Sequence, residues 1–338
     1  MLDVFNSDAF NVVSLTDAIN KIKFVPGRVS SLGLFEETSS AVTTVAIEQK
    51  DGTLVLVPPS ARGGPGTTID KSKRSMLSIN VPHFQIDDAV MAEEVQGVRA
   101  FGSEDQLDTV LRLVSERLGI HAQSMAATEE HARLGAIKGV VTYADSSTLD
   151  LFTTFGVSQI SEKAFDFANK VSGELRAYCA GVIREIAGEL GGTPFSGAMA
   201  LCSDTFFDAL LKNAEVRASY LNQQEARELR SPYIVNGGQS YGSFEFGGII
   251  WENYRGSVGA TKFIDDDKCH IFPLGVPRLF RTVYAPADYM ETVNTLGRRL
   301  YAKQFPMRND KGVEMEVQSN ALHYCTRPRV LIKGKLGS

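Results

Sequence analysis

The chain has 338 residues, of which 43% are hydrophobic and 22% charged, and its formal net charge is -5, which suits a globular protein of about two domains. This composition excludes a disordered chain, and the acidic balance argues against a protein that grips nucleic acid through a basic face. Because no run of about 18 apolar residues occurs and residues 1–20 are amphipathic and acidic, we expect a soluble, intracellular protein without a membrane span.

The first segment, residues 1–34, is predicted to form an N-terminal arm with one short helix. Ser14 or Thr16 can cap this helix, and Pro26 with Gly27 ends it. The apolar residues of the arm are scattered, and no partner strand follows nearby. We therefore expect the arm to dock elsewhere.

Residues 35–91 are predicted to form an extended loop built on a β-hairpin. Two β-rich runs, residues 42–49 and 53–57, flank Lys-Asp-Gly at residues 50–52, and Asp-Gly between such runs predicts a hairpin turn. The glycine-rich stretch after them favours an open loop. An isolated two-stranded hairpin is marginal in water, so we expect a neighbouring copy of the chain to supply the missing contacts of this loop.

The tip of this loop is locally basic, and acidic residues gather just after it. The tip residues that we expect at an interface between subunits are Arg62, Gly63, Gly64, Lys71, Lys73 and Arg74. Their predicted acidic complement on the neighbour is Asp87, Asp88, Glu93, Glu94, Glu104, Asp105 and Asp108. Opposite charges on the two sets would determine the register between neighbours more than their affinity. A tip that is simply solvated explains the same basic charges equally well.

A long helix is predicted over residues 104–138. Ser103 precedes Gln106 by three positions, which is the spacing of a capping box. Apolar residues then recur mostly at three- and four-residue steps, so that most of them share one stripe. At about 1.5 Å per residue the helix would be about 50 Å long. Gly119 and Gly135 interrupt it, which indicates a kink or a close packing contact.

Two strands and a second long helix are expected before residue 193. The strands are predicted at residues 140–143 and 148–155, and the helix at residues 161–190. Gly191 and Gly192 provide its stop signal.

The rest of the chain reads as a separate α/β lobe followed by a C-terminal return. Ser203 is expected to cap a short helix, and another helix is expected from near Pro286. Strands are predicted at residues 195–201, 233–235, 244–254, 312–318 and 330–332, and a strand or loop at residues 271–274. Gly247 and Gly248 predict a bulge or turn inside the third of these strands. The fold class is therefore α+β.

No motif has the spacing that a catalytic, cofactor or metal site requires. The three consecutive aspartates at residues 265–267 point in different directions, and His121 and His131 are too far apart on one helix to share an ion. The glycines at residues 63–66 lack the phosphate-loop pattern, and residues 242–243 do not form a nucleophile elbow. The four cysteines are widely spaced and are expected to be reduced. We expect no enzyme activity, no cofactor and no metal.

Several motifs of the last third are typical of one family. They are PLG at residues 273–275, APADYMETVNTLG at 285–297, YAKQ at 301–304, DKG at 310–312, QSN at 318–320 and CTRP at 325–328. VPPSARGGPG at residues 57–66 and LCSDTFFDALL at 201–211 continue the similarity upstream. On these motifs the chain resembles the major capsid protein of tailed phages in the lambda-type E family, over nearly its whole length.

The resemblance implies a Hong Kong 97-like capsid fold with five segments. They are an N-terminal arm at residues 1–34, an extended loop at 35–91, a spine helix and the first part of a peripheral domain at 92–192, an axial domain at 193–279, and a C-terminal return to the peripheral domain at 280–338. It implies a structural protein of the virion, assembled in the host cytoplasm. Its copies would form hexamers and pentamers of an icosahedral shell that encloses packaged double-stranded DNA.

The partners that the resemblance implies are further copies of the chain, a scaffolding protein, a portal and, as a further candidate, a decoration protein. Because Met1 lies close to the arm, we expect the scaffold to be a separate protein. Packaged DNA is expected only in non-specific proximity, since binding through counterion release needs Lys and Arg at the phosphates. No membrane partner is expected.

Two other classes of protein stay open at this point. A hydrolase with a site in residues 193–279 would require a pocket with converging titratable groups. A tail-tube-like subunit would assemble into helical tubes rather than closed shells.

Overall fold

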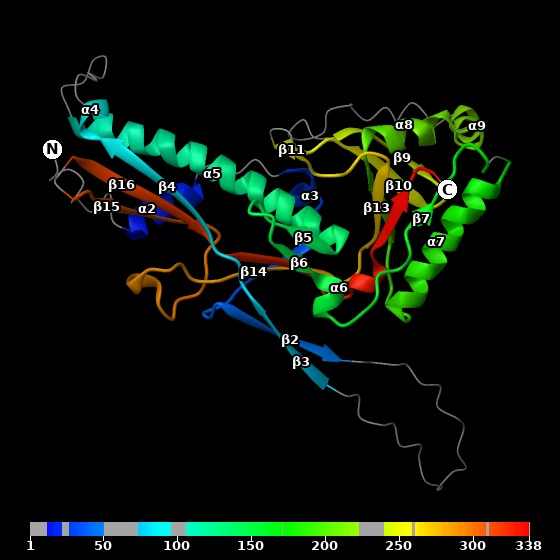
Figure 1. Cartoon of the computed structure of the whole chain (residues 1–338), viewed down its shortest axis with the longest axis horizontal. Coiled ribbons are helices and arrows are strands. Elements are labelled where there is room, and N and C mark those ends of the chain that lie inside the picture. The colour runs from blue at the N-terminus through cyan, green and yellow to red at the C-terminus, as the bar shows by residue number, and fades with distance from the viewer. Residues whose placement is uncertain are drawn as a thin grey trace, which may run out of the picture. The chain divides into compact units, whose positions relative to one another are not determined.

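Figure 1 shows the computed structural model, which describes residues 12–21, 27–50, 74–95, 106–170, 172–222, 240–258, 261–308 and 311–337. The described residues divide into two units, each drawn from separate stretches of sequence. Unit 1 comprises those within residues 1–45, 80–133 and 281–323, and unit 2 those within residues 46–79, 134–280 and 324–338. Both units combine helices and strands, so the predicted α+β class is confirmed.

A three-stranded antiparallel sheet forms the base of unit 1. Its order is β15 (Tyr301–Pro306), β16 (Gly312–Ser319) and β4 (Phe84–Met91). In β16 the alternation of the sequence places Val313, Met315 and Val317 in the core, while Glu314 is exposed. This confirms the half-exposed strand predicted at residues 312–318.

Two helices close the core of unit 1 over this sheet. They are α2 (Val12–Lys21) and α5 (Gln106–Lys138). The buried apolar residues that pack together here are Leu15, Ile19, Val90, Val114, Leu118, Met125, Leu300, Ala302, Met315 and Val317. The helix predicted at residues 104–138 therefore exists within two residues of its expected start, and its apolar stripe faces the core.

The N-terminal helix α2 covers the open edge of β15. Thr16 Oγ1 accepts a hydrogen bond from the Ala302 N–H at 3.2 Å and donates one to the Ala302 carbonyl at 3.3 Å. Asn20 Nδ2 donates to the Leu300 carbonyl at 2.9 Å. The surface on which this part of the arm docks is thus a sheet edge of its own chain, whose exposed backbone groups it satisfies.

A second three-stranded sheet of unit 1 has the order β1 (Phe35–Ser39), β14 (Phe280–Tyr284) and β17 (Ala321–Cys325). The short helix α3 (Arg28–Ser31) precedes β1, and the short helix α4 (Ala92–Val95) follows β4. Strands from the beginning and the end of the chain therefore share one sheet.

The two strands that pair in the extended loop lie farther apart in the sequence than the predicted hairpin strands. Strand β2 (Thr44–Lys50) pairs with β3 (Arg74–Asn80) in a two-stranded sheet, which Figure 1 shows as two neighbouring arrows. The turn predicted at residues 50–52 and the strand at 53–57 lie largely outside the described residues. The described ladder of β2 thus joins segments that are more than twenty residues apart.

Unit 2 is built on a six-stranded mixed sheet. The order is β7 (Lys163–Ala164), β18 (Ile332–Lys335), β13 (Lys268–Leu274), β8 (Gly197–Cys202), β10 (Ile249–Tyr254) and β9 (Ser240–Phe246). Unit 2 also contains helices α7 (Glu174–Leu190), α8 (Asp204–Lys212) and α9 (Ala214–Asn222), and the strand pairs of β5 (Val140–Thr142) with β6 (Thr148–Asp150) and of β11 (Ser257–Val258) with β12 (Thr261–Lys262).

An aromatic cluster forms part of the core of unit 2. Trp251 is fully buried, and Phe165 meets it edge to face with ring centroids 5.4 Å apart. Phe206 stacks on Trp251 at 6.0 Å. The indole N–H donates to the Phe246 carbonyl at 3.1 Å, so the buried polar atom is satisfied.

The interruption at Gly135 has a packing cause. A Cβ at this position would lie 2.7 Å from the Cα of Val141, the middle residue of β5 after the helix. Only glycine allows this close approach. A Cβ at Gly119, by contrast, would meet nothing within 4 Å. The expected close packing contact therefore occurs at Gly135.

Two predicted elements are wrong in extent. The helix expected at residues 161–190 begins only at Glu174, because residues 163–164 instead form β7 and pair with β18. The strand expected at residues 148–155 stops at Asp150, whose carboxylate accepts the Phe152 N–H at 2.8 Å and starts α6 (Leu151–Thr154). The pairing of β7 with β18 shortened the predicted helix, and the cap at Asp150 shortened the predicted strand.

The helix expected near Pro286 is also wrong. The structure has only a short 3-10 helix, η3 (Met290–Thr292), followed by Asn294 with a positive φ of 60°. The hydroxyl of the buried Thr292 holds this turn, because it donates to the Ala287 carbonyl at 2.7 Å and to the Tyr289 carbonyl at 3.0 Å. The last strand is β18, after a second 3-10 helix, η4 (Pro328–Val330), rather than residues 330–332.

The remaining strand predictions compare as follows. The strand at residues 195–201 exists as β8, and that at 271–274 is part of β13. The strand at residues 244–254 divides into β9 and β10 around Gly247 and Gly248, which have φ of 64° and 79°. Residues 233–235 lie outside the described residues.

The grouping of the later segments follows the sheet order. Residues 134–192 group with unit 2, and so do the last described residues from 324 onward, because β7 and β18 extend the sheet of β13 and β8. Residues 281–323 group with unit 1.

Candidate assembly surfaces

The basic tip of the extended loop is outside the described part of the chain. Arg62, Gly63, Gly64, Lys71 and Lys73 are not described, and Arg74 is described only as the first residue of β3. The predicted interface at this tip therefore stays a prediction.

The acidic complement is described in part. Asp87 and Asp88 are neighbours on β4, and Glu93 and Glu94 lie on α4. Asp108 belongs to α5, but its side chain is not described, and Glu104 and Asp105 lie outside the described residues. Four of the seven expected carboxylates can thus be placed.

The pleat of β4 sends its two aspartates to opposite faces of the sheet. Asp88 faces α5, where its carboxylate accepts hydrogen bonds from Arg117 Nη1 at 3.2 Å and pairs with His121 Nε2 at 2.8 Å. Glu94 binds the other nitrogen of the same guanidinium, Nη2, at 2.7 Å. Asp88 and Glu94 are therefore already engaged inside their own subunit.

Asp87 and Glu93 remain on the exposed side. Asp87 lies directly opposite Glu316 of β16, and like charges in such a pair repel each other. Each of the two accepts a hydrogen bond from a neutral amide, Asp87 from Gln85 at 2.8 Å and Glu316 from Gln318. Of the four carboxylates that can be placed, Asp87 and Glu93 are therefore the exposed ones.

Replacing Asp88 by Asn is expected to destabilise unit 1 by about 1 kcal/mol at pH 7, since the group is partly exposed and its ion pairs are screened. Burial alone would raise the pKa of Asp88 above its ordinary 3.8, but the Ala89 N–H, His121 and Arg117 together lower the pKa below it. A lowered pKa stabilises the fold above the ordinary value, and the effect is lost as the pH falls through the folded pKa. Urea denaturation should therefore show the two proteins converging in stability below about pH 3.8. A constant difference across this range would contradict the assignment.

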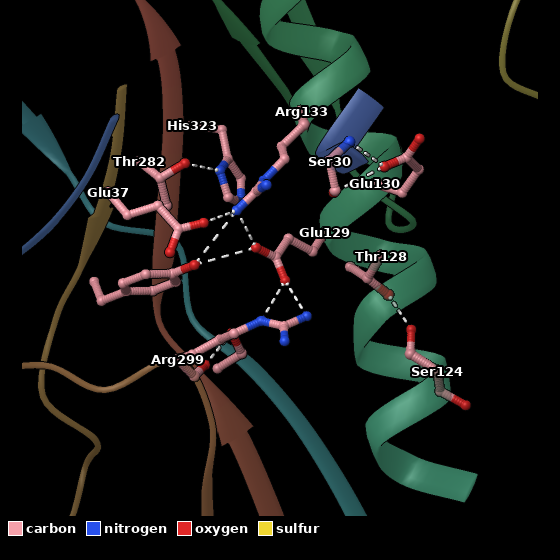
Figure 2. A network of polar contacts seen from close by, with 12 residues as sticks. Ser30, Glu37, Ser124, Thr128, Glu129, Glu130, Arg133, Thr282, Arg299 and His323 are labelled. Atoms are coloured by element: carbon pink, nitrogen blue, oxygen red, sulfur yellow. Dashed lines mark hydrogen bonds and ion pairs between the residues drawn. The ribbon is translucent and has the colours of Figure 1, made fainter. Parts of the chain in front are cut away.

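A buried ion network that the sequence analysis did not single out lies in unit 1 (Figure 2). Glu129 and Arg133 of α5 form an ion pair at 2.6 Å, and Arg133 Nη2 also reaches Glu37 of β1 at 2.6 Å. Arg299 binds the second oxygen of Glu129 through Nε at 2.8 Å and Nη2 at 2.7 Å. Tyr284 of β14 donates its hydroxyl to Glu129 at 3.2 Å.

The positive and negative charges of this network neutralise one another within unit 1. Two glutamates face two arginines, and Glu129 and Arg133 are 9% and 5% exposed. Burial would raise the pKa of Glu129, but Arg133 and Arg299 together hold the pKa below its ordinary value. Glu129 therefore stays ionised and links α5 to β1, β14 and the segment before β15. The only sequence signal for it was the spacing of four residues between Glu129 and Arg133.

His323 of β17 lies at the edge of the same network. Burial lowers the pKa of this imidazole to about 3, with Glu129 opposing the shift and the two arginines adding to it. The neutral ring shares a hydrogen bond with the Thr282 hydroxyl at 2.8 Å. Because the unfolded chain binds a proton here near pH 6.5 and the folded chain does not, the fold loses stability as the pH falls below that value.

Glu130, the next residue after Glu129 on α5, binds the segment that contains α3. Its carboxylate accepts the Val29 N–H at 2.6 Å, and the Ser30 N–H at 3.1 Å with the Ser30 hydroxyl at 2.9 Å. These contacts satisfy the first backbone donors of α3. Glu130 and Arg133 of α5 thus hold α3 and β1 in place.

Two further observations concern other kinds of site. Among the residues that the structure describes, no three His, Cys, Asp or Glu side chains converge as a metal ion would need. No described helix has the length and apolar character to span a membrane.

Comparison with known proteins was made on the whole chain. Residues 11–336 match the family model described as phage major capsid protein E. The major capsid protein of Pseudomonas phage KPP10 is 27% identical, with 96% of this chain and 97% of that protein covered. The major capsid protein of Salmonella phage Felix O1 is 26% identical, with 98% of each covered. Among solved structures, a prophage capsid protein of E. coli CFT073 is similar in fold, with a TM-score of 0.58, 12% identity, and 96% of this chain and 99% of that chain covered.

Proposed function

The chain belongs to the phage major capsid protein E family, and on that premise we propose how its segments serve the shell. It is a major capsid protein: many copies form the capsid of the virion, and its fold is Hong Kong 97-like. The family match over residues 11–336 carries this conclusion.

We propose that the extended loop, residues 35–91, reaches a neighbouring subunit. Its described base, β2 with β3, is a sheet of only two strands, which is marginal on its own in water. The basic tip, Arg62 to Arg74, would meet Asp87 and Glu93 of the neighbour. This pairing would relieve the repulsion between Asp87 and Glu316 and would set the register of adjacent subunits.

For the segments, we propose α5 as the spine helix and unit 1 as the peripheral domain. Residues 193–279 would form the axial domain, with β7, α7 and β18 added to it. The sheet order supports this extension, since β18 and β7 continue the sheet that contains β13 and β8. The ion network of Glu129 would then hold the spine helix against β1 and β14.

The partners beyond the subunit itself are also proposals. We propose that hexamers and pentamers assemble with a scaffolding protein and a portal, that a decoration protein is a further candidate, and that packaged DNA lies near the shell without specific contacts. The net charge of -5 supports the last point, since specific or tight DNA binding needs clustered cations. The role is structural, without catalysis.

Negative-stain electron microscopy of the purified full chain, alone and with the scaffolding protein expressed beside it, tests this function. Closed shells are the expected result. Helical tubes would favour the tail-tube alternative. Persistent monomers that hydrolyse ester or peptide substrates would favour a hydrolase with a site in residues 193–279.

A further inference from the structure

Two buried cysteines of unit 2 face each other on neighbouring strands of the six-stranded sheet. Cys202 is the last residue of β8, and it lies directly opposite Cys269 of β13 in the antiparallel register. Both are free thiols, and both are 0% exposed. Directly opposed residues of an antiparallel pair point to the same face of the sheet, so the two thiols are neighbours.

The hydrogen bonds of this ladder determine how closely the two cysteines approach. The Ser203 N–H donates to the Lys268 carbonyl at 3.0 Å. Because hydrogen-bonded and non-hydrogen-bonded pairs alternate along an antiparallel ladder, the next pair, Cys202 with Cys269, is non-hydrogen-bonded. In such a pair the Cα atoms lie about 4.5 Å apart and the side chains are at their closest. A disulfide needs Cα atoms about 4.4 to 6.8 Å apart, so the backbone already has the required spacing.

The surroundings leave the two sulfurs free to turn toward each other. Gly334 of β18 lies opposite Cys269 on its other side, and a Cβ there would lie 2.5 Å from the Cys269 sulfur. Glycine therefore provides the space in which the Cys269 side chain can rotate. The Cys202 thiol contacts the Ala200 carbonyl at 3.8 Å, which is a weak hydrogen bond. Rotation about the Cα–Cβ bonds breaks no strong contact of either thiol among those that the structure describes.

Burial keeps the Cys202 sulfur in its protonated form. It raises the pKa of this thiol well above its ordinary 9.0, and the hydrogen bond with Cys269 adds to the shift. A third thiol, Cys179 of α7, has its pKa raised to about 12 by burial, with the nearby Cys269 adding to it. The thiolate is the form that reacts with oxidants, so we expect these cysteines to oxidise slowly.

We propose that Cys202 and Cys269 form a cross-strand disulfide when the protein meets peroxide outside the reducing interior of a cell. One thiolate attacks hydrogen peroxide, which breaks the O–O bond, gives a sulfenic acid and releases hydroxide. The second thiolate attacks the sulfenic sulfur, which forms the S–S bond and expels a second hydroxide. The two thiol protons convert these hydroxides to water, so two thiols and one peroxide give one disulfide and two water molecules.

This inference rests on the proposed function for its setting, since a virion leaves the reducing cytoplasm while its coat must stay folded. The disulfide would join β13 to β8 and would close the chain between residues 202 and 269, which contains α8, α9, β9 and β10. A cross-link that closes so long a stretch restricts the unfolded chain strongly. We expect the midpoint of thermal unfolding to rise by at least about 5 °C.

The test uses the purified full chain, unassembled and as particles, incubated with hydrogen peroxide and then quenched with catalase. The protein is unfolded in guanidinium with N-ethylmaleimide, and its peptides are mapped by mass spectrometry. Free thiols should fall from four to two per chain, and one peptide pair should join Cys202 to Cys269. Dithiothreitol should restore all four. Four remaining thiols, sulfinic acids without a cross-link, or a disulfide that includes Cys179 or Cys325 would overturn the inference.

Two serine variants make the stability measurement specific. Cys202→Ser removes one partner, so peroxide should shift its unfolding midpoint by less than about 1 °C. The matched control is Cys325→Ser, because Cys325 is also 0% exposed but lies on β17, in a different sheet. Its midpoint should still rise with peroxide as that of the unaltered chain does. Equal shifts in the two variants would contradict the assignment.

The outcomes separate this inference from the proposed function. If Cys202→Ser does not fold, the peptide map of the unaltered chain still decides whether the disulfide forms. Closed shells without the cross-link overturn the inference and leave the shell function standing. If the chain forms no shells, the proposed function has failed, and the peptide map of the unassembled chain still tests the thiol pair.

Discussion

Reversing the charges of Arg62, Lys73 and Arg74 together is expected to abolish shell assembly while the subunit remains folded. Each contact between a basic tip and its acidic partner would contribute about 1 kcal/mol, and reversal turns attraction into repulsion of similar size. Three such changes weaken the association of two subunits by about 6 kcal/mol, which is more than about ten-thousandfold. Light scattering and negative-stain microscopy measure the loss.

Two matched proteins make this experiment specific. The variant Arg62→Lys, Lys73→Arg and Arg74→Lys keeps every charge and should assemble normally. Adding Asp87→Lys and Glu93→Lys to the reversed tip should restore particles, because the two sets are again opposite in sign. Normal particles from the reversed tip alone would rule out the loop as a device between subunits, and a lack of rescue would place its acidic partner elsewhere.

The second large effect is expected from Glu129→Gln. The change keeps the shape of the side chain but removes the charge that faces Arg133 and Arg299. Breaking one side of a buried ion pair leaves its partner without compensation and costs about 3 to 5 kcal/mol. Chemical denaturation of the unassembled full chain should show this loss in the free energy of unfolding.

Glu116→Gln provides the control for this measurement. It makes the same chemical change on the same helix, but Glu116 is exposed. We expect a change below about 0.5 kcal/mol there. If Glu129→Gln is as mild as Glu116→Gln, the network does not hold α5 against β1 and β14.

The candidate surfaces show what local sequence patterns can predict and what they cannot. Composition and spacing identified an acidic set after the basic tip, and four of its members can be placed. Composition and spacing could not show that Asp88 binds within its own subunit while Asp87 stays exposed, because this depends on which face of β4 the helix α5 covers. Once α5 supplies Arg117 and His121, Asp88 is engaged internally, while Asp87 faces Glu316 on the other side.

What the sequence by itself determined is local in origin. The extent of α5 follows from its apolar stripe, the alternating strand β16 from a period of two, and the turn between β9 and β10 from Gly247 and Gly248, because each pattern acts on neighbouring residues. Only the tertiary structure decided the pairing of β2 with β3, the strand β7 in place of a longer α7, and the network of Glu129. Their stabilisation comes from partners distant in the chain, and no local pattern records which distant residue will be brought close by folding.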